Sequence, residues 1–296
     1  MTGSPQPVDP RDTAPQRVLP LVVRVERADP PTRTDALEAA AIAVLTLLTD
    51  PRSHPAADHP AADHPAADHP AADHPAADHP GADLAAADPA ASAMGVPADH
   101  PGPGGASAVP PAGAGEWAAA VREWADARIG KVVRRARGAE WRRAAALDGI
   151  TVAHRTAEVR VFPPVPLDGW PRDLARLQVS GTDLADPAEP PPPRPGVPVL
   201  WLNPHLELTA GKAMAQVGHA AQLGWEALDQ ADRERWQDGG FDLAVRTASR
   251  ARWPHLLRAG LPLVREAGFT EIAAGTCTAV ADHPALRPQR SRSPGG

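Results

Sequence analysis

The chain has 296 residues, enough for one large domain or two small ones, and its single cysteine excludes an internal disulfide. Its net charge of −6 arises between residues 51 and 115, which hold eight aspartates and one arginine, so the remainder is nearly neutral and neither demands nor excludes a polyanionic partner. No run reaches the roughly 18 apolar residues of a membrane span, and the N-terminus lacks the apolar core of a signal peptide, so we expect a cytoplasmic protein without membrane contact.

The predicted elements begin within residues 17–50. A run rich in β-branched residues at 18–25 predicts a buried strand, and the alanine-rich stretch 36–48 predicts a helix capped by Thr34 or Asp35. After an interruption, the patterns predict a helix at 116–130, a strand at 131–136, a helix at 138–147 and one or two strands within 150–164.

The interruption, residues 51–115, is dominated by the repeated sequence AADHP. Each unit carries a proline and almost no large apolar side chain, so the segment cannot bury enough surface to offset the entropy lost on ordering. We predict a disordered linker. The alternative is metal binding by the repeated Asp-His pairs, which is disfavoured because widely spaced histidines in a flexible chain are poorly preorganised ligands.

A proline-rich spacer at residues 184–196 precedes the C-terminal half, residues 197–285, and residues 286–296 are predicted to be a disordered tail. The patterns of the C-terminal half predict a strand at 197–202, a long helix at 209–231, a strand at 241–248, a helix at 251–260 and a final strand region at 270–281. This alternation of strands and helices is typical of an α/β fold with a parallel or mixed sheet.

The N-terminal half, residues 17–50 plus 116–183, repeats the order of elements of the C-terminal half. Four pairs of residues match between the halves: Arg134 with Arg246, Trp141 with Trp253, Gly149 with Gly260, and Val152 with Val264. Two α/β units of one biased composition can look alike by chance, but the shared order of four elements favours a duplication. The linker then interrupts the first copy between two helices, where surface insertions are tolerated.

The long helix of the C-terminal half opens with the sequence TAGKAMAQVGHAA. Helical spacing places Lys212, Gln216 and His219 on one face. Gly211 permits close backbone approach, and the free N–H groups at the helix start favour a phosphate or an oxyanion beside Lys212. A phosphate-binding P-loop is excluded because Ala213 stands where Ser or Thr would follow the lysine. The alternative for each of these residues is a merely solvated polar stripe.

This opening resembles the first signature of the type II peptidyl-tRNA hydrolases of bacteria and archaea, Gly-Lys-x-x-Ala-Gln-x-x-His-Ala. The sequence EAGFTEIAAGTCT at residues 266–278 resembles their second signature, Asp-Ala-Gly-x-Thr-Gln-Ile-x-x-Gly-x-x-Thr. The two signatures lie at the expected ends of a domain of the expected size, and the resemblance covers the C-terminal half only. It implies a three-layer α/β/α domain with a mixed sheet, preceded here by a degenerate copy of the same fold.

The resemblance implies hydrolysis of the ester that joins a peptide, or an N-blocked amino acid, to the 3′ end of tRNA, without a metal or organic cofactor. The implied catalytic positions are Lys212, Glu266, Thr270 and Thr278. We add His219 as an alternative to Glu266 for deprotonating water. We expect contacts with the substrate or the tRNA from Gly211, Gln216, Gly275 and Thr276.

Three positions depart from the family pattern: Glu266 replaces aspartate, Phe269 replaces a common arginine, and Glu271 replaces glutamine. The acid is kept with a longer reach, and the local charge changes. The alternative function is therefore a non-catalytic module that binds tRNA or protein. The intact Lys212, Thr270 and Thr278 favour the enzyme. A nucleotide-cofactor protein is disfavoured because the chain has no glycine-rich phosphate loop.

The N-terminal half lacks the catalytic groups. In our alignment on the strands, Thr34, Glu38 and Ala41 replace Lys212, Gln216 and His219. Because the family resembled here often works as a homodimer, an empty first copy would supply that interface within one chain. We therefore expect a monomer that acts as a pseudo-dimer. The lone Cys277 is expected to be a small buried residue rather than a nucleophile.

Overall fold

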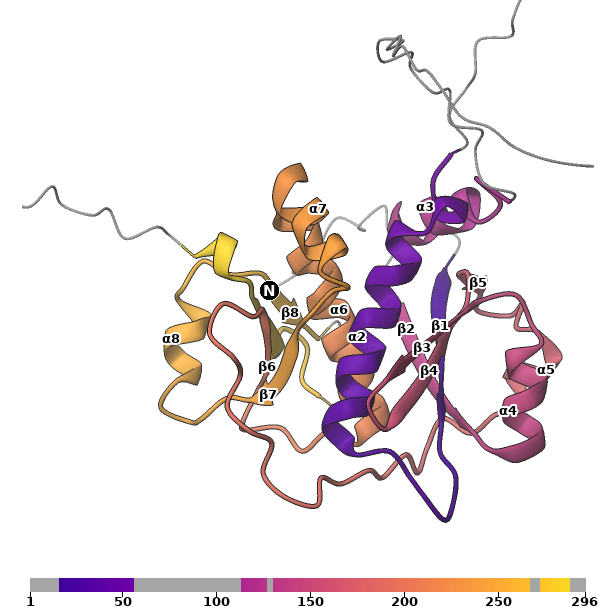
Figure 1. Cartoon of the computed structure of the whole chain (residues 1–296), viewed down its shortest axis with the longest axis horizontal. Helices are drawn as coiled ribbons and strands as arrows, with labels where there is room; N and C mark the ends of the chain where they lie inside the picture. The colour runs from indigo at the N-terminus through magenta and orange to yellow at the C-terminus, as the bar shows by residue number, and fades with distance from the viewer. Residues whose placement is uncertain (1–15, 56–112, 127–129, 267–271, 288–296) are drawn as a thin grey trace, which may run out of the picture. The chain divides into compact units, whose positions relative to one another are not determined.

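The apolar run near the N-terminus forms β1 (Arg17–Arg24), the central strand of the first of two mixed sheets. The computed structural model, shown in Figure 1, describes residues 16–55, 113–126, 130–266 and 272–287. The N-terminal half continues with α2 (Arg33–Thr49), η1 (Pro51–Ser53), α3 (Ala118–Asp126), β2 (Gly130–Ala136), α4 (Gly138–Ala145), β3 (Ile150–His154), β4 (Ala157–Val161), β5 (Val165–Pro166) and α5 (Arg172–Ala175). Its strands lie in the order β2-β1-β4-β3, with β5 also pairing with β1.

The C-terminal half forms the second mixed sheet. Its elements are β6 (Val199–Leu202), α6 (Ala210–Ala227), α7 (Gln230–Asp238), β7 (Ala244–Thr247), α8 (Trp253–Leu257), β8 (Leu263–Arg265), β9 (Cys277–Asp282) and η2 (Pro284–Leu286). The strand order is β7-β6-β9-β8, in which β6 is parallel to β7 and antiparallel to β9. The first sheet has the same pattern, because β1 is parallel to β2 and antiparallel to β4. Both halves are thus mixed α/β units of one topology.

The ladders of the two sheets agree with two of the sequence matches. Taking Arg134 and Arg246 as equivalent aligns the row Arg134, Val22, Arg160 and Thr151 with the row Arg246, Trp201, Val280 and Leu263. These rows bring Val152 into register with Val264, so the two matches are consistent with each other.

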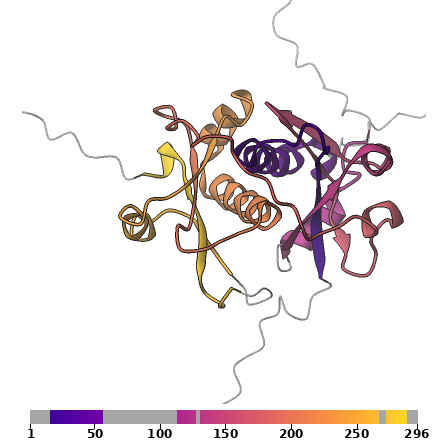
Figure 2. The same ribbon diagram turned by 90° about the horizontal axis from the view of Figure 1, so that it is seen from below.

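Side chains of each sheet alternate between two cores, as the period of a strand requires. Leu19 and Leu21 of β1 join Leu200 and Leu202 of β6 in one core that includes both α2 and α6. Figure 2 shows these two helices lying between the sheets. On the outer faces, α4 and α5 cover the first sheet and α8 covers the second. Each half is thus three-layered, and the helical layer in the middle is shared.

Helices α2 and α6 approach closely at Gly218. A Cβ atom at this position would lie 3.0 Å from Val44 on α2 and 3.4 Å from Lys131 on β2. The segment 177–196, which we call the strap, then joins the halves around the starts of both helices. Its Asp186 carboxylate accepts hydrogen bonds of 2.8 Å from the backbone N–H and the hydroxyl of Thr34.

Two predicted boundaries were wrong. The cap of α2 is Thr32, whose hydroxyl accepts from the Asp35 N–H, rather than Thr34 or Asp35, because Thr32 has the extended backbone of a cap. The helix predicted at 209–231 ends at Ala227, since Leu228 is extended and buried, and the Asp229 carboxylate caps the separate helix α7.

The edges of the predicted linker and tail pack on their neighbours. In the N-terminal half, the Trp117 N–H donates to the carbonyl of Arg52, whose guanidinium lies 3.7 Å from the Trp117 ring. At the other end, Arg287 forms an ion pair with Asp282. The rest of the linker, 56–112, lies outside the described residues. No helix in the described part of the chain has the length and hydropathy to span a membrane.

Candidate active site

A β-bulge distinguishes the sheet of the C-terminal half from that of the N-terminal half. Val264 pairs with Ala279, but the next residue of β8, Arg265, pairs with Cys277, so Thr278 is an extra residue on β9. The equivalent pairing of β3 with β4 runs without a shift. Bulges often re-aim a side chain beside an active site. This one lies in the second signature.

The bulged Thr278 contacts the first signature directly. Its hydroxyl donates to the Gln216 side-chain oxygen on α6, with the two atoms 2.5 Å apart. Thr278 is completely buried, whereas Gln216 is partly exposed. The hydroxyl therefore orients the amide, and the amide nitrogen of Gln216 remains the donor with which this side chain can bind a substrate oxygen.

Glu266 lies immediately after β8 at the neck of a loop. Its N–H donates to the Thr276 carbonyl at 2.9 Å, and its carbonyl accepts from the Gly275 N–H at 2.8 Å. Gly275 has a φ of +81°, which a glycine adopts without strain. Gly275 and Thr276 thus close the loop and fix the backbone of the buried Glu266. The predicted catalytic Thr270, with Phe269 and Glu271, lies outside the described residues.

The N-terminus of α6 is less open than the sequence indicated. Thr209 caps it by accepting from the Lys212 N–H, and the Ala210 N–H donates to the Thr182 carbonyl of the strap at 3.1 Å. A Cβ atom on Gly211 would lie 3.5 Å from Thr182, so the glycine lets the strap approach the helix. The expectation of free N–H groups at this end was therefore wrong for Ala210 and Lys212, since the strap and the cap use them. The partly exposed Lys212 side chain stands one turn before Gln216.

His219 lies beside the other half of the chain. Burial, together with the nearby positive charge of Lys131 on β2, lowers the pKa of His219 to about 3. Burial also lowers the pKa of Lys131 to about 7, although its ammonium donates to the Gln222 side chain at 2.6 Å. The structure thus joins Gln216 to Thr278, while His219 belongs to the boundary between the halves.

The corresponding place in the N-terminal half holds different residues. Because Thr32 and Thr209 cap α2 and α6 in the same way, Asp35 occupies the place of Lys212. The alignment with Thr34 in that place was therefore wrong by one residue. By the sheet registers, His154 occupies the place of Glu266. The N-terminal half thus has an acid, Asp35, at the position of Lys212, and an imidazole, His154, at the position of Glu266.

Asp35 and His154 belong to an ion-pair network that is centred on Glu38 and crosses to the other half. The buried Glu38 carboxylate binds Arg155 at 2.7 Å, His154 at 3.0 Å and Arg246 of β7 at 2.9 Å. Burial alone would raise the pKa of Glu38, but hydrogen bonds from His154, the Val245 N–H and Arg246 together lower it. The oxygens and nitrogen of Asp35, Glu38 and His154 lie close enough for a metal ion. The guanidinium groups of Arg155 and Arg246 already pair with these carboxylates. The cluster is therefore better explained as an ion-pair contact that joins the two halves than as a cation site.

Two further residues shape the site. Asn203, buried just after β6, donates to the Cys277 carbonyl at 2.7 Å and accepts from the His205 N–H at 2.8 Å, so it fixes the strand end beside the bulge. Its only signal in the sequence is an Asn that follows a buried strand. Cys277 itself is buried, and burial raises the pKa of its thiol, which agrees with a structural role.

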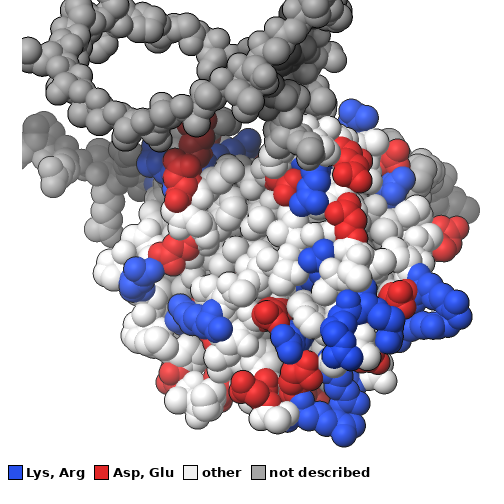
Figure 3. Space-filling view, turned by 45° about the vertical axis from the view of Figure 1, so that its right-hand side comes forward, with Lys and Arg blue, Asp and Glu red and all other residues white. Residues whose placement is uncertain are grey.

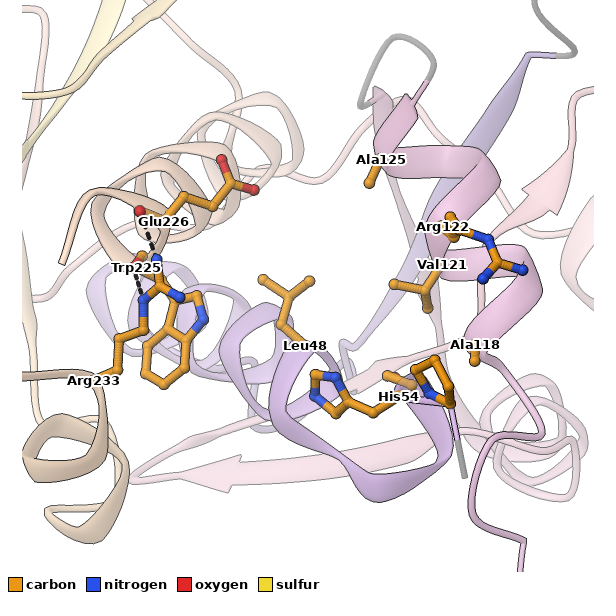
Figure 4. A pocket seen from close by; sticks show the side chains of 11 residues that line it. Leu48, His54, Ala118, Val121, Arg122, Ala125, Trp225, Glu226 and Arg233 are labelled. Carbon is orange, nitrogen blue, oxygen red and sulfur yellow. Dashed lines mark hydrogen bonds between the residues drawn. The ribbon is translucent and has the colours of Figure 1, made fainter. Parts of the chain in front are cut away.

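A cavity of about 280 Å³ lies at the far end of α6. Figure 4 shows Leu48 and Val121 of the N-terminal half facing Trp225 and Glu226 of α6, with Arg233 bonded to the carbonyls of the latter two. Trp225 lies 13 residues after Lys212, a helical rise of about 20 Å. This cavity is therefore separate from the candidate site.

Two three-layer halves, and a buried threonine bonded to a helix glutamine at a β-bulge in the second of them, define an α/β protein with a polar site in its C-terminal half. The family profile "Peptidyl-tRNA hydrolase PTH2" matches residues 197–290. Two relatives named "Peptidyl-tRNA hydrolase", from the R1 and NRC-1 strains of Halobacterium salinarum, are each 39% identical over 94 residues, which cover 29% of this chain and 84% of the relative. The chain belongs to the PTH2 family of peptidyl-tRNA hydrolases through its C-terminal half.

Proposed function

We propose that the C-terminal half hydrolyses the ester between a peptide and the 3′ end of tRNA. The observation that carries the proposal is the hydrogen bond between Thr278 and Gln216, because it unites the two family signatures at one strand end. The backbone of Glu266 is fixed at the same strand end by Gly275 and Thr276, and Lys212 precedes Gln216 by one turn of the same helix.

Ester hydrolysis requires an attacking water, stabilisation of the oxyanion and a proton for the leaving ribose oxygen. In the proposed mechanism, Glu266 orients and deprotonates the water that attacks the ester carbon. Lys212 and the Gln216 amide nitrogen stabilise the negative charge of the tetrahedral intermediate. The bond to the ribose 3′ oxygen then breaks, and this oxygen takes up a proton as the peptide leaves as a carboxylate. Thr278 positions Gln216, and Thr270 is the remaining position that the family signature proposes.

His219 is the weaker candidate for the base. With a pKa of about 3 it stays neutral at pH 7, and so low a basicity gives little driving force for taking a proton from water. Its place beside Lys131 argues for a role in packing the halves together. The base is therefore assigned to Glu266.

The test is release of the blocked amino acid from N-acetyl-aminoacyl-tRNA by the purified full chain. We expect turnover in the wild type and its loss in both Lys212→Ala and Glu266→Ala. Glu207→Ala, which removes an exposed acid on the loop before α6, is the matched control and should keep full turnover. Equal turnover in Glu266→Ala would refute the assignment. No turnover in the wild type, with tRNA still bound, would favour the non-catalytic binding module.

The proposal includes a duplicated, empty N-terminal half that serves as the partner of the catalytic half. The common strand order, the equivalent rows and the replacement of Lys212 by Asp35 support it. The chain is then a monomer of 30.9 kDa that contains its own pseudo-dimer. Light scattering that gives twice this mass would contradict the monomer.

A further inference from the structure

Positive charge is concentrated in one part of the N-terminal half. Residues 130–181 contain ten Lys or Arg and five Asp or Glu, a net charge of +5, whereas the rest of that half, residues 17–50, 116–129 and 182–183, contains six Lys or Arg and nine Asp or Glu. Residues 197–287 contain nine Lys or Arg and ten Asp or Glu, a net charge of −1, so the half with the candidate site has no excess of the positive charge that favours binding to a tRNA backbone.

Much of this charge lies on one surface of the N-terminal half. Arg142 and Arg143 of α4 and Arg172 and Arg176, at the two ends of α5, are exposed, and the two helices pack together. Within the described part of the chain, the one ion pair that these four form is between Arg143 and Asp173; it is exposed and 3.4 Å long, so it neutralises little of their charge. Figure 3, which turns this side towards the viewer, shows Lys and Arg side chains gathered at the lower right. We call these four residues and Arg135 the arginine surface.

Not every arginine near this surface is free of structural contacts and able to bind a phosphate. The Arg134 guanidinium donates to the carbonyls of Ala175 and Leu177 and lies 4.3 Å from the Trp170 ring, so it holds α5 in place. In α8 of the C-terminal half, the positions that follow the matched tryptophan are Pro254 and His255 instead of two arginines. The arginine surface is thus a property of the N-terminal half only.

The strap connects the arginine surface to the candidate site. Arg135 of β2 binds Gln178 through both its backbone and its side chain, and a Cβ atom on Gly181 would lie 3.8 Å from its guanidinium. One residue further on, Thr182 contacts the start of α6 at Ala210. The four residues that follow Gln178, up to Thr182, span at most about 14 Å of extended chain. The arginine surface therefore begins within the length of a few nucleotides from the start of α6, where Lys212 lies.

We propose that the N-terminal half is the tRNA-binding half, and that the arginine surface binds the phosphate backbone of the acceptor arm whose 3′ end enters the site of the C-terminal half. This inference rests on the proposed function. The half that has lost the catalytic groups would thus contribute substrate affinity rather than chemistry. Backbone contacts of this kind act without regard to tRNA sequence and weaken as salt rises.

The test compares the variant Arg142→Ala/Arg176→Ala with the control Arg250→Ala/Arg258→Ala, which removes two exposed arginines of the C-terminal half. Each is assayed with N-acetyl-aminoacyl-tRNA and with N-acetyl-aminoacyl-adenosine, which has the ester but no tRNA body. We expect the first variant to raise KM for the tRNA substrate at least tenfold and to reduce the slope of log KM against log salt by about one to two. It should cleave the adenosine ester like the wild type, and the control should match the wild type with both.

Equal KM values and salt slopes in the wild type and the arginine variant would overturn the inference, and so would an equal loss in both variants. If the wild type cleaves neither ester, the proposed function fails, and fluorescence anisotropy with deacylated tRNA decides the inference separately. Weaker binding by Arg142→Ala/Arg176→Ala than by the control supports it, and equal binding refutes it.

Discussion

Glu38 of α2 and Arg246 of β7 form a buried ion pair of 2.9 Å across the boundary between the two halves. The same carboxylate accepts from the Val245 N–H at 3.1 Å, so a side chain of the N-terminal half satisfies the edge strand of the second sheet. An exposed edge strand would otherwise offer unpaired backbone groups to other chains. Glu38 on α2 thus attaches the N-terminal half to the edge of the second sheet.

Replacing Glu38 with Ala should destabilise the fold strongly. The change leaves Arg246 and the Val245 N–H without their shared acceptor inside the boundary, and breaking a buried pair typically costs about 3–5 kcal/mol. Urea unfolding of Glu38→Ala and of the exposed control Glu234→Ala measures the effect. A loss in Glu38→Ala no larger than that in Glu234→Ala would contradict the structural role of the network.

The same network predicts a loss of stability in acid. The pKa of Glu38 is lowered in the folded chain, so the unfolded chain binds its proton first as the pH falls. The stabilisation is present above the ordinary glutamate pKa, about 4.3, and disappears as the pH falls through the lowered value. Unfolding measured between pH 3 and 6 should show a shallower decline in Glu38→Gln than in the wild type. Parallel curves would count against the assignment.

Lys131 predicts a dependence of the same sign in a different window, above neutral pH. Its pKa is lowered to about 7, so between pH 7 and about 10 the unfolded chain holds a proton that the folded chain has released. Stability should therefore rise with pH in this window, by up to about 1.4 kcal/mol per pH unit. Lys131→Met should flatten the rise, whereas Lys212→Met, which changes the only other lysine of the chain, should not. Identical slopes for Lys131→Met and the wild type would disprove the shift.

Thr278→Val should reduce kcat about 10- to 100-fold, with little change in KM, because the Gln216 amide loses the hydroxyl that orients it. Thr278→Ser restores the hydroxyl and should recover most of the rate. Steady-state kinetics with N-acetyl-aminoacyl-tRNA tests both variants. If Ser and Val lower kcat equally, the methyl group and packing matter, and the positioning role is wrong.

Thr182→Val should stabilise the fold, in contrast to Glu38→Ala. The Thr182 hydroxyl is buried and has no hydrogen-bond partner among the described residues, so its removal relieves an unmet polar group. We expect the free energy of unfolding to rise by about 1 kcal/mol. Chemical denaturation checks this against Thr182→Ser, which keeps the hydroxyl. A less stable Thr182→Val would mean that the hydroxyl is satisfied in solution, for example by a bound water.

Local patterns were enough to predict most elements and the family. The β-branched run at 18–25 and the alanine-rich helices were found because hydrophobic periodicity is a local property. The bulge at Thr278 was not predicted from the sequence, because it depends on the register between two strands that a loop separates. The contacts of Lys131 with α6 and of Thr182 with Gly211 were missed for a similar reason. They join residues about 90 and 30 positions apart in sequence, and nothing local marks them as partners.

The strap has a consequence for how the two halves stay together. In a dimer of separate chains, dilution shifts the balance towards monomers, whereas two halves joined by a short segment meet at an effective concentration set by that segment, in the millimolar range for short flexible connections. Bonds such as that between Thr34 and Asp186 shorten its reach further. The contacts of Glu38 and Lys131 with the C-terminal half therefore persist at nanomolar protein, and the surroundings of the candidate site do not depend on how much of the protein a cell contains.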